Sequence, residues 1–311
     1  MPGETTPMMK QYLQMKAEHP DCILMFRLGD FYEMFNEDAK LASQELDLTL
    51  TTRDRNKPKE ERTPMCGVPY HSVESYIARL INKGYKVAIC EQMEDPALAK
   101  GLVDRDIIRI VTPGTLMESS MLEEGRNNFL ASLCLDGEGV GVCFCDISTG
   151  EVSATALRGK DWMEHLRNEL GRYAPREAVL NAAAWEDLEL RDFLRTRLEC
   201  RCEQGREADF APEAARAAAQ KQFRTGLEGL PEGAEAALRA CGGLLTYLYE
   251  TQKTDLSHLT AFHYYQSGEF MELDLTARRN LELTETLRGK EKKGSLLWVL
   301  DKTRTAMGGR L

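Results

Sequence analysis

The sequence predicts a multidomain α/β protein, and three patterns along its 311 residues indicate this class. In the first third, short apolar runs typical of buried strands are separated by segments whose apolar residues recur at helical spacing. In the middle third, three extended segments joined by glycine-containing turns precede an alternation of helical and extended segments. Near the C-terminal end of the chain, apolar residues again recur at helical spacing. A chain of this length ordinarily forms about two domains, and its 42% hydrophobic content is sufficient for buried cores.

The first unit begins with a strand followed by a helix. Cys22–Phe26 is a short, continuous apolar run, and Gly29 then allows the backbone to turn. After this turn, apolar residues recur at helical spacing, and Asp30 is well placed to cap a helix. We therefore expect a helix that begins near Phe31 and holds Phe31 and Glu33 in its first turn. The apolar positions with this spacing are Phe35, Ala39, Ala42 and Leu46.

The rest of the first unit adds strands and one more helix. Leu48–Thr51 has an extended pattern, and a basic, proline-containing loop follows it. Ser72 can cap a helix that Gly84 ends, with Val73, Ile77, Leu80 and Ile81 as its apolar positions. Strands are expected at Lys86–Cys90 and Ile107–Val111, and Pro113-Gly114 marks the exit.

The second unit, from about Asn127 to Thr251, has a different order of elements. Three antiparallel strands are expected at 129–135, 140–147 and 152–157, joined by glycine-containing turns. Three strands followed by α/β alternation is the layout of the ribonuclease H fold. The later expected segments are helical at 161–170, 186–198, 212–222 and 234–251, and extended at 178–181 and 199–203.

This fold admits a nuclease as an alternative function. Asp146 lies near the end of an expected strand, where a nuclease of this architecture could keep a metal-binding carboxylate. Two-metal chemistry needs several convergent carboxylates, and the sequence has no clear set of them. We interpret Asp146 as a turn residue beside Ser148-Thr149-Gly150.

The chain changes pattern again from about Leu256. Phe270–Asp274 leads into two expected helical segments, Thr276–Leu287 and Leu296–Thr305, separated by the charged loop Arg288–Lys293. The arginine pair Arg278-Arg279 is typical of a solvated helix face. This part predicts the beginning of a helical domain.

Phe31 and Glu33 have a purely structural interpretation on the local pattern. Glu33 follows Asp30 at the spacing of a capping box, and Phe31 precedes Phe35 by four residues, as an ordinary packing pair does. Capped helix starts are much commoner than sites that contact bases. The wider sequence is needed to weigh a functional role.

Five blocks of the first unit occur in a fixed order: Thr6–Met9, Gly29–Glu33, Pro64–His71, Val87–Gln92 and Arg109–Thr115. Taken together, they resemble the mismatch-recognition domain of the MutS family of DNA mismatch repair proteins. In that family a Phe-x-Glu motif recognises the mismatch, and it corresponds here to Phe31 and Glu33. The resemblance implies a mismatch-recognition domain at 1–115, a ribonuclease H-like connector domain at 116–255, and the start of a helical core at 256–311.

The resemblance implies a DNA-binding function rather than catalysis. An aromatic wedge that enters the minor groove unstacks one base step, and this costs less where a mismatch has already weakened the stack. We expect Phe31 to stack on a base and Glu33 to hydrogen-bond the displaced base. The alternative is a protein-interaction module, because the family docks MutL through its connector domain. A MutS relative without mismatch specificity is disfavoured, since such relatives generally lack the Phe-x-Glu motif.

The net charge of −10 argues superficially against nucleic acid, but charge placement matters more. Residues 1–115 carry 15 Lys and Arg against 18 Asp and Glu, and a basic loop from 53 to 62 lies beside the Phe-x-Glu motif. A charge run alone is more often a solvated loop. The weaker candidates for DNA-backbone contacts are Arg53, Lys57, Arg62, His71 and Arg109.

The remaining composition limits cofactors and compartment. Nine cysteines fit a reducing cytoplasm, and Cys143-x-Cys145 and Cys200-x-Cys202 are too closely spaced for a usual zinc clamp, so no metal is expected. No GxxxxGK[ST] motif occurs, so we expect no ATP hydrolysis by this chain; the resemblance places ATP and Mg²⁺ in a separate ATPase domain. No apolar stretch approaches 18 residues. The expected partners are mismatched double-stranded DNA, a second MutS subunit and MutL, in a bacterial, nucleoid-associated setting.

Overall fold

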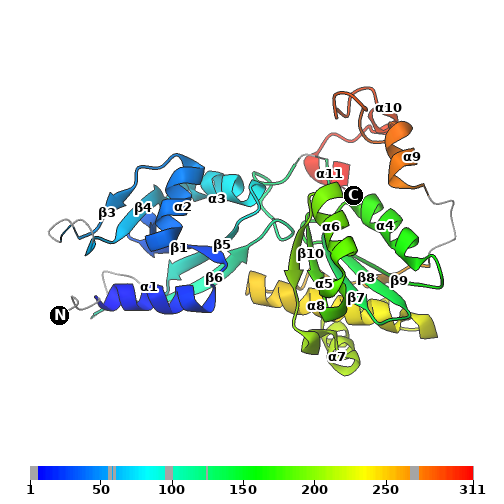
Figure 1. Ribbon diagram of the computed structural model, residues 1–311, viewed down its shortest axis with the longest axis horizontal. Coiled ribbons are helices and arrows are strands. Elements are labelled where there is room, and N and C mark those ends of the chain that lie inside the picture. The colour runs from blue at the N-terminus through cyan, green and yellow to red at the C-terminus, as the bar shows by residue number, and fades with distance from the viewer. Residues whose placement is uncertain are drawn as a thin grey trace. The chain divides into compact units, whose positions relative to one another are not determined.

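The computed structural model describes residues 6–54, 58, 61–94, 101–123, 125–266 and 273–310. The chain divides into two compact units (Figure 1), one formed by Met1–Pro113 with Glu250–Asp255 and the other by Gly114–Tyr249 with Leu256–Leu311. The α/β class predicted from the sequence is confirmed, because each unit contains a six-stranded mixed sheet with helices.

The sheet of the first unit has the strand order β3-β4-β2-β1-β5-β6. β1 pairs in parallel with β5, and the other neighbours are antiparallel. The strands near Lys86 and Ile107 are where the sequence predicted them. The bounds are β1 Cys22–Leu28, β2 Phe31–Phe35, β3 Thr51–Thr52, β4 Pro64–Pro69, β5 Lys86–Gln92 and β6 Arg105–Val111.

Helices cover both faces of this sheet. Helix α1 (Pro7–Glu18) lies on one face, where Tyr12 makes edge contacts with the rings of Phe26 and Phe35. Helices α2 (Asn36–Leu46) and α3 (Val73–Asn82) lie on the other face (Figure 1). The predicted helix after Ser72 is confirmed, but the Ser72 hydroxyl makes no capping hydrogen bond and contacts Pro69 O instead.

The expectation that Phe31 and Glu33 lie in the first turn of a helix is wrong. Both lie in β2, which forms a hairpin with β1 and pairs on its other edge with β4, so its backbone bonds are satisfied on both sides. Gly29, at a φ of +58°, makes the hairpin turn. Asp30 does not cap a helix; its carbonyl oxygen accepts a bond from Tyr70 N at 2.9 Å.

The helix itself begins five residues later than expected. The helical spacing at Ala39, Ala42 and Leu46 was correctly recognised, since all three are buried in α2. Phe35 occupies the N-cap position without a side-chain bond, and Asn36 turns the chain at a φ of +53°. The capping-box and packing-pair interpretation therefore fails for Phe31 and Glu33.

The sheet of the second unit has the order β11-β10-β7-β8-β9-β12. Its three antiparallel strands, β7 to β9, confirm the prediction, and β10 and β11 add in parallel beside β7. The bounds are β7 Leu130–Leu135, β8 Gly139–Asp146, β9 Glu151–Arg158, β10 Glu177–Leu180, β11 Arg201–Gln204 and β12 His263–Tyr264. This is the layout expected of a ribonuclease H-like domain.

Helices pack on both faces of the second sheet. Leu166, Leu170, Leu190 and Leu194 belong to the apolar cluster on one face, and Leu244 and Leu248 to the cluster on the other. Gly141 in β8 allows helix α8 to lie close against the sheet, since a Cβ at this position would lie 1.9 Å from Ala236 O. The helices are α4 Trp162–Tyr173, α5 Ala182–Glu186, α6 Leu188–Arg197, α7 Pro212–Gln222 and α8 Glu235–Gln252.

Asp146 is a turn residue, as interpreted from the sequence. Its side chain is fully buried and accepts bonds from Asn128 N at 3.0 Å, Ser148 N at 2.9 Å and Ser148 Oγ at 2.7 Å. Thr149 and Gly150 N bond to its carbonyl oxygen. Both carboxylate oxygens are therefore used inside the protein, and within the described residues no group of three or more His, Cys, Asp or Glu could hold a metal.

The two long helical segments expected near the end of the chain are wrong in extent. The structure has only α9 (Leu275–Asn280), α10 (Leu296–Leu300) and α11 (Ala306–Arg310) there. The side chains of α10 are exposed, with Leu300 at 67%, and short helices without a buried face are marginal. The expected lead-in Phe270–Glu272 lies outside the described residues.

Candidate nucleic-acid interface

The β1–β2 hairpin presents a large aromatic side chain to solvent. Phe31, the first residue of β2, is 47% exposed, whereas Tyr32, Met34 and Phe35 in the same strand are buried. Its cross-strand neighbours are Leu28 in β1 and Pro69 in β4. Burial of such a ring is worth about 2 kcal/mol, so the folded chain leaves a favourable contact unmade at this position.

Glu33 lies two residues along β2, on the same face as Phe31. Its cross-strand neighbours are Phe26 and Gly67. A Cβ at Gly67 would lie 3.4 Å from Glu33 Cγ and 3.2 Å from Tyr32 O, so the glycine leaves room for the glutamate side chain. Gly67 thus lets the carboxyl group fold down against the sheet.

The Glu33 carboxyl group is half-buried and has no hydrogen-bond partner among the described residues. Burial raises the pKa of Glu33, and the nearby Arg53 guanidinium opposes that shift. A partly desolvated acid without internal donors is costly unless an external group satisfies it. Phe31 and Glu33 together therefore form an exposed ring beside a half-buried acid that has no hydrogen-bond partner among the described residues.

The basic residues proposed from the sequence are only partly gathered around this pair. Arg53 is exposed, follows β3 and acts electrostatically on Glu33. His71 is exposed in the turn η2 (Tyr70–Ser72), directly after Pro69 and Tyr70. Arg62 is half-buried, and Lys57 lies outside the described residues.

Arg109 does not join this group. It lies in β6, separated from β2 by β1 and β5. Its neighbour Ile110 belongs to the cluster with α1, on the face of Phe26 and Leu28, so Arg109 projects from the opposite face. The sequence placed Arg109 correctly in a strand but did not give its face.

Arg105 is a cation on the Phe31 and Glu33 face that the sequence analysis missed. Its guanidinium carbon lies 4.9 Å from the centroid of the Phe26 ring, and Phe26 is the cross-strand neighbour of Glu33. Arg105 donates to Arg27 O at 2.9 Å and to Gln11 Oε1 at 3.2 Å. Its alternation with Ile107 was the available signal, but the expected strand began two residues later.

The opposite face of the hairpin is braced around Arg27. The Arg27 guanidinium carbon lies 3.9 Å from the centroid of the Tyr70 ring and 5.5 Å from that of Tyr32. Arg27 also pairs with Glu91 at 3.3 Å, and the Tyr32 hydroxyl donates to the same carboxylate. Cation–π and charged contacts of this kind fix the hairpin that carries Phe31.

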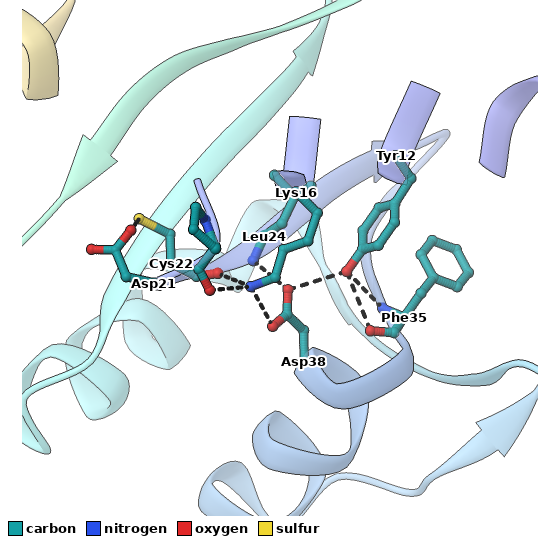
Figure 2. Close-up of polar contacts among 8 residues, drawn as sticks. Tyr12, Lys16, Asp21, Cys22, Leu24, Phe35 and Asp38 are labelled. Carbon is teal, nitrogen blue, oxygen red and sulfur yellow. Dashed lines mark hydrogen bonds and ion pairs between the residues drawn. The ribbon is translucent and has the colours of Figure 1, made fainter. Parts of the chain in front are cut away.

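A buried polar network fixes the other end of β2 (Figure 2). Asp38 in α2 accepts bonds from Tyr12 Oη at 3.1 Å, Leu24 N at 3.0 Å and Lys16 Nζ at 2.8 Å. Phe35 N donates to the Tyr12 hydroxyl at 3.3 Å, and that hydroxyl also lies 3.2 Å from Phe35 O. The network joins α1, β1 and α2 at the residue where β2 ends.

Comparison with known proteins assigns this fold to one family. Models of MutS domain I, MutS domain II and MutS domain III match residues 6–120, 128–260 and 276–311. The chain is 50% identical over 309 residues, 99% of its length, to the DNA mismatch repair protein MutS of Ruminiclostridium cellulolyticum. It is 49% identical to the proteins of that name from Acetivibrio thermocellus and Clostridium novyi, over 98% of its length.

This chain belongs to the MutS family and carries domains I and II and the start of domain III. It spans 33–35% of the length of these relatives. Phe31 and Glu33 fall within the domain I match. None of the helices in the described part of the chain combines the length and apolar character needed to cross a membrane.

Proposed function

We propose that this chain recognises mispaired or unpaired bases in double-stranded DNA as part of mismatch repair. The observation that carries the proposal is the pairing, on one face of β2, of an exposed Phe31 ring with a half-buried Glu33 that has no internal hydrogen-bond partner among the described residues. The relatives named DNA mismatch repair protein MutS support the biological context.

Phe31 supplies the wedge in this proposal. Inserted from the minor groove, its ring stacks on one base and separates one base step, which kinks the duplex. A mispaired step has already lost part of its stacking and pairing, so the deformation costs less there than in paired DNA. The contacts around Arg27 that hold the β1–β2 hairpin support this role. A rigid hairpin loses little conformational entropy when the Phe31 ring enters the base stack.

Glu33 forms a hydrogen bond with the base that Phe31 displaces. Burial already favours the protonated form, and phosphates and a dry base stack favour it further. A protonated Glu33 donates a hydrogen bond to a base acceptor, while the ionised form accepts one from a base donor. Arg53 and Arg105 contribute positive charge near this face.

The proposal is tested by titrating the chain with two DNA duplexes that are identical except for one mismatch, at two salt concentrations. The chain is expected to bind the mismatched duplex more tightly, and Phe31→Ala to remove that preference by deleting a stacking contact worth about 1–3 kcal/mol. Ile108→Ala is the matched control, since Ile108 is an exposed apolar residue of β6 in the same sheet.

Equal affinity of the unaltered chain for both duplexes, or a preference that survives Phe31→Ala, contradicts the proposal. A loss of affinity for both duplexes that grows with salt reports phosphate contacts instead. Arg53, Arg62 and His71 are the described residues to substitute for that component, and Arg109 serves as a comparison because it projects from the other face.

Protein partners form the second part of the proposal. In the second unit, the edge strand β11 and the 71% exposed Leu188 at the start of α6 offer a surface of the kind that protein partners bind. We propose MutL as a partner of residues 116–255 and a second MutS subunit as a partner of the longer relatives. The first of these two partners is tested by passing the chain over immobilised MutL. The chain is expected to be retained, and Leu188→Glu is expected to abolish retention.

The proposed chemistry assigns no reaction to this chain. The motif GxxxxGK[ST] does not occur in its sequence, and we propose that ATP and Mg²⁺ act in the longer relatives, outside the segments that this chain matches. A cytoplasmic, nucleoid-associated location follows from the proposed DNA substrate. ATP hydrolysis by the purified chain would contradict this division of roles.

A further inference from the structure

The segment from Arg288 to Arg304 differs in charge from the rest of the protein. It holds six Lys and Arg against two Asp and Glu, a net charge of +4, in a chain whose net charge is −10. All six cations are exposed. Positive charge concentrated on one part of an acidic protein attracts polyanions. The six residues are Arg288, Lys290, Lys292, Lys293, Lys302 and Arg304.

Backbone hydrogen bonds fold the first part of this segment into a closed loop. Leu296 N donates to Glu282 O at 3.0 Å, and Leu297 N donates to Leu283 O at 2.8 Å. The residues between these bonds, 284–295, therefore begin and end side by side. Four of the six cations lie in this loop, and the other two follow α10.

An ion pair joins the loop to the residues that follow α10. The Lys292 ammonium pairs with one carboxylate oxygen of Asp301, and Thr303 N and Oγ1 donate to the other oxygen at 2.8 and 2.6 Å. Lys293 and Lys302 each follow one member of this pair directly in the sequence. The two basic stretches therefore meet at the ion pair, because consecutive Cα atoms are only about 3.8 Å apart.

The other five cations have no ion-pair partner among the described residues. Glu291, the second acid of the segment, is exposed and forms no ion pair within that part of the chain. Solvated cations held close together repel one another. Bound phosphates relieve this repulsion and release counterions, so the charge pattern favours a polymer that carries repeated negative charge.

Trp298 places an exposed aromatic ring between the two basic stretches. It lies in α10 and is 49% exposed, whereas Trp162 and Trp185 pack against an apolar cluster of the second sheet. Ser295 Oγ accepts from Trp298 N at 3.2 Å and donates to Lys292 O at 2.7 Å, which fixes the start of α10 to the basic loop. An exposed ring of this kind can stack on an unpaired base.

This combination favours single-stranded nucleic acid over other polyanions. Proteins that bind single strands without regard to sequence contact the phosphates with cations and stack bases on aromatic rings. The bases of a duplex are already stacked on one another, and an acidic polypeptide offers carboxylates without bases. We propose that residues 288–304 form a second nucleic-acid site, which binds a single strand of DNA or RNA. The site shares no residue with the proposed mismatch contacts, which lie in the first unit.

Fluorescence titration of the whole chain with an oligodeoxythymidylate and an oligouridylate, each about ten nucleotides long, tests the proposal. Stacking on Trp298 is expected to quench its emission, and the probe that quenches assigns the strand to DNA, to RNA or to both. In Trp298→Leu the remaining tryptophan emission should stay unquenched, and the affinity for a labelled probe should fall on the order of tenfold. Emission of the unaltered chain that neither probe quenches overturns the proposal.

The triple variant Lys290→Gln, Lys293→Gln, Lys302→Gln tests the phosphate contacts. Each contact with a single strand releases about 0.7 of a counterion, so the slope of log K against log salt should fall in magnitude by about 2. The matched control removes the same charge from exposed cations elsewhere in the second unit and should keep the slope. Equal slopes for the two triple variants overturn the proposal. The control is Lys160→Gln, Arg197→Gln, Arg224→Gln.

Comparison of ligands separates single strands from the other polyanions. The basic triple variant should lose more affinity for the single strand than for a paired duplex or for poly-L-glutamate, and an equal or larger loss for either of these overturns the proposal. Phe31→Ala should leave the quenching of Trp298 unchanged, because Phe31 lies in the first unit. Loss of single-strand binding in Phe31→Ala would assign that binding to the first unit and overturn the second site.

Discussion

Two carboxylates, Glu33 in the first unit and Asp146 in the second, show how a structural acid differs from a candidate binding acid. Asp146 is fully buried at the end of β8 and accepts three hydrogen bonds from its own chain. Glu33 is half-buried in β2 and accepts none from the described residues. Satisfaction of hydrogen bonds, rather than burial alone, separates a turn residue from a group available to a ligand.

The largest effect expected from this comparison concerns Asp146. Asp146→Ala removes the acceptor of the buried Asn128 N–H and of the half-buried Ser148 N–H, and should lower the free energy of unfolding by about 3 kcal/mol. Urea unfolding measures it. Asp136→Ala is the matched control, because Asp136 caps the exposed turn before β8 with bonds of 3.2 Å to Glu138 N and Gly139 N. An equal loss of unfolding free energy in Asp146→Ala and Asp136→Ala would contradict the structural role given to Asp146.

The next effect concerns the network that fixes the end of β2 (Figure 2). Tyr12→Phe removes the hydroxyl that binds Asp38 and Phe35, and should cost about 1–2 kcal/mol of unfolding free energy. Tyr85→Phe, which removes a bond to Glu45 at 3.1 Å in a more open site, is the control and should cost about 0.5 kcal/mol. Indistinguishable unfolding midpoints would mean that the network does not hold β2.

The smallest expected effect concerns the pH dependence of stability at Glu33. Because burial raises the pKa of Glu33 in the folded chain, the folded state holds this proton to a higher pH than the unfolded state does. The carboxylate therefore lowers stability as pH rises through the window from the unfolded value, about 4.3, up to the raised folded value. Below that window its penalty vanishes.

Glu33→Gln should remove this contribution, so the difference in stability between the variant and the unaltered chain should grow across that window. Glu37→Gln is the control, since the Glu37 side chain is 83% exposed. Thermal unfolding at a series of pH values measures both. Parallel curves for all three proteins would mean that Glu33 is not held in a desolvated environment.

The sequence predicted the elements whose signals are local. Lys86 to Cys90, Val73 to Ile81 and Pro212–Gln222 each carry an apolar pattern of one period, and the structure confirms the strand and the two helices. Asp146 was interpreted correctly because the following Ser148-Thr149-Gly150 is itself a turn signal. In these cases the neighbouring residues alone determine the conformation.

The secondary-structure predictions are wrong where residues distant in the sequence determine the conformation. Asp30 and Glu33 have the spacing of a capping box, but β4, some thirty residues later, pairs with Phe31–Phe35 and makes it a strand. The apolar spacing near Leu296 overestimated the helices, because no described partner buries that face. The missing internal partner of Glu33 is a tertiary fact without a sequence signal, whereas the face of Arg105 could have been read from its alternation with Ile107 had the expected strand begun at Arg105.

A structure of the chain bound to a duplex that contains one mismatch tests most directly whether Phe31 and Glu33 recognise the mispaired base. The Phe31 ring is expected to stack on a base at the mismatched step of a kinked duplex, with the Glu33 carboxyl group within hydrogen-bond distance of that base. A complex in which Phe31 contacts only protein and Glu33 lies away from every nucleotide would contradict it.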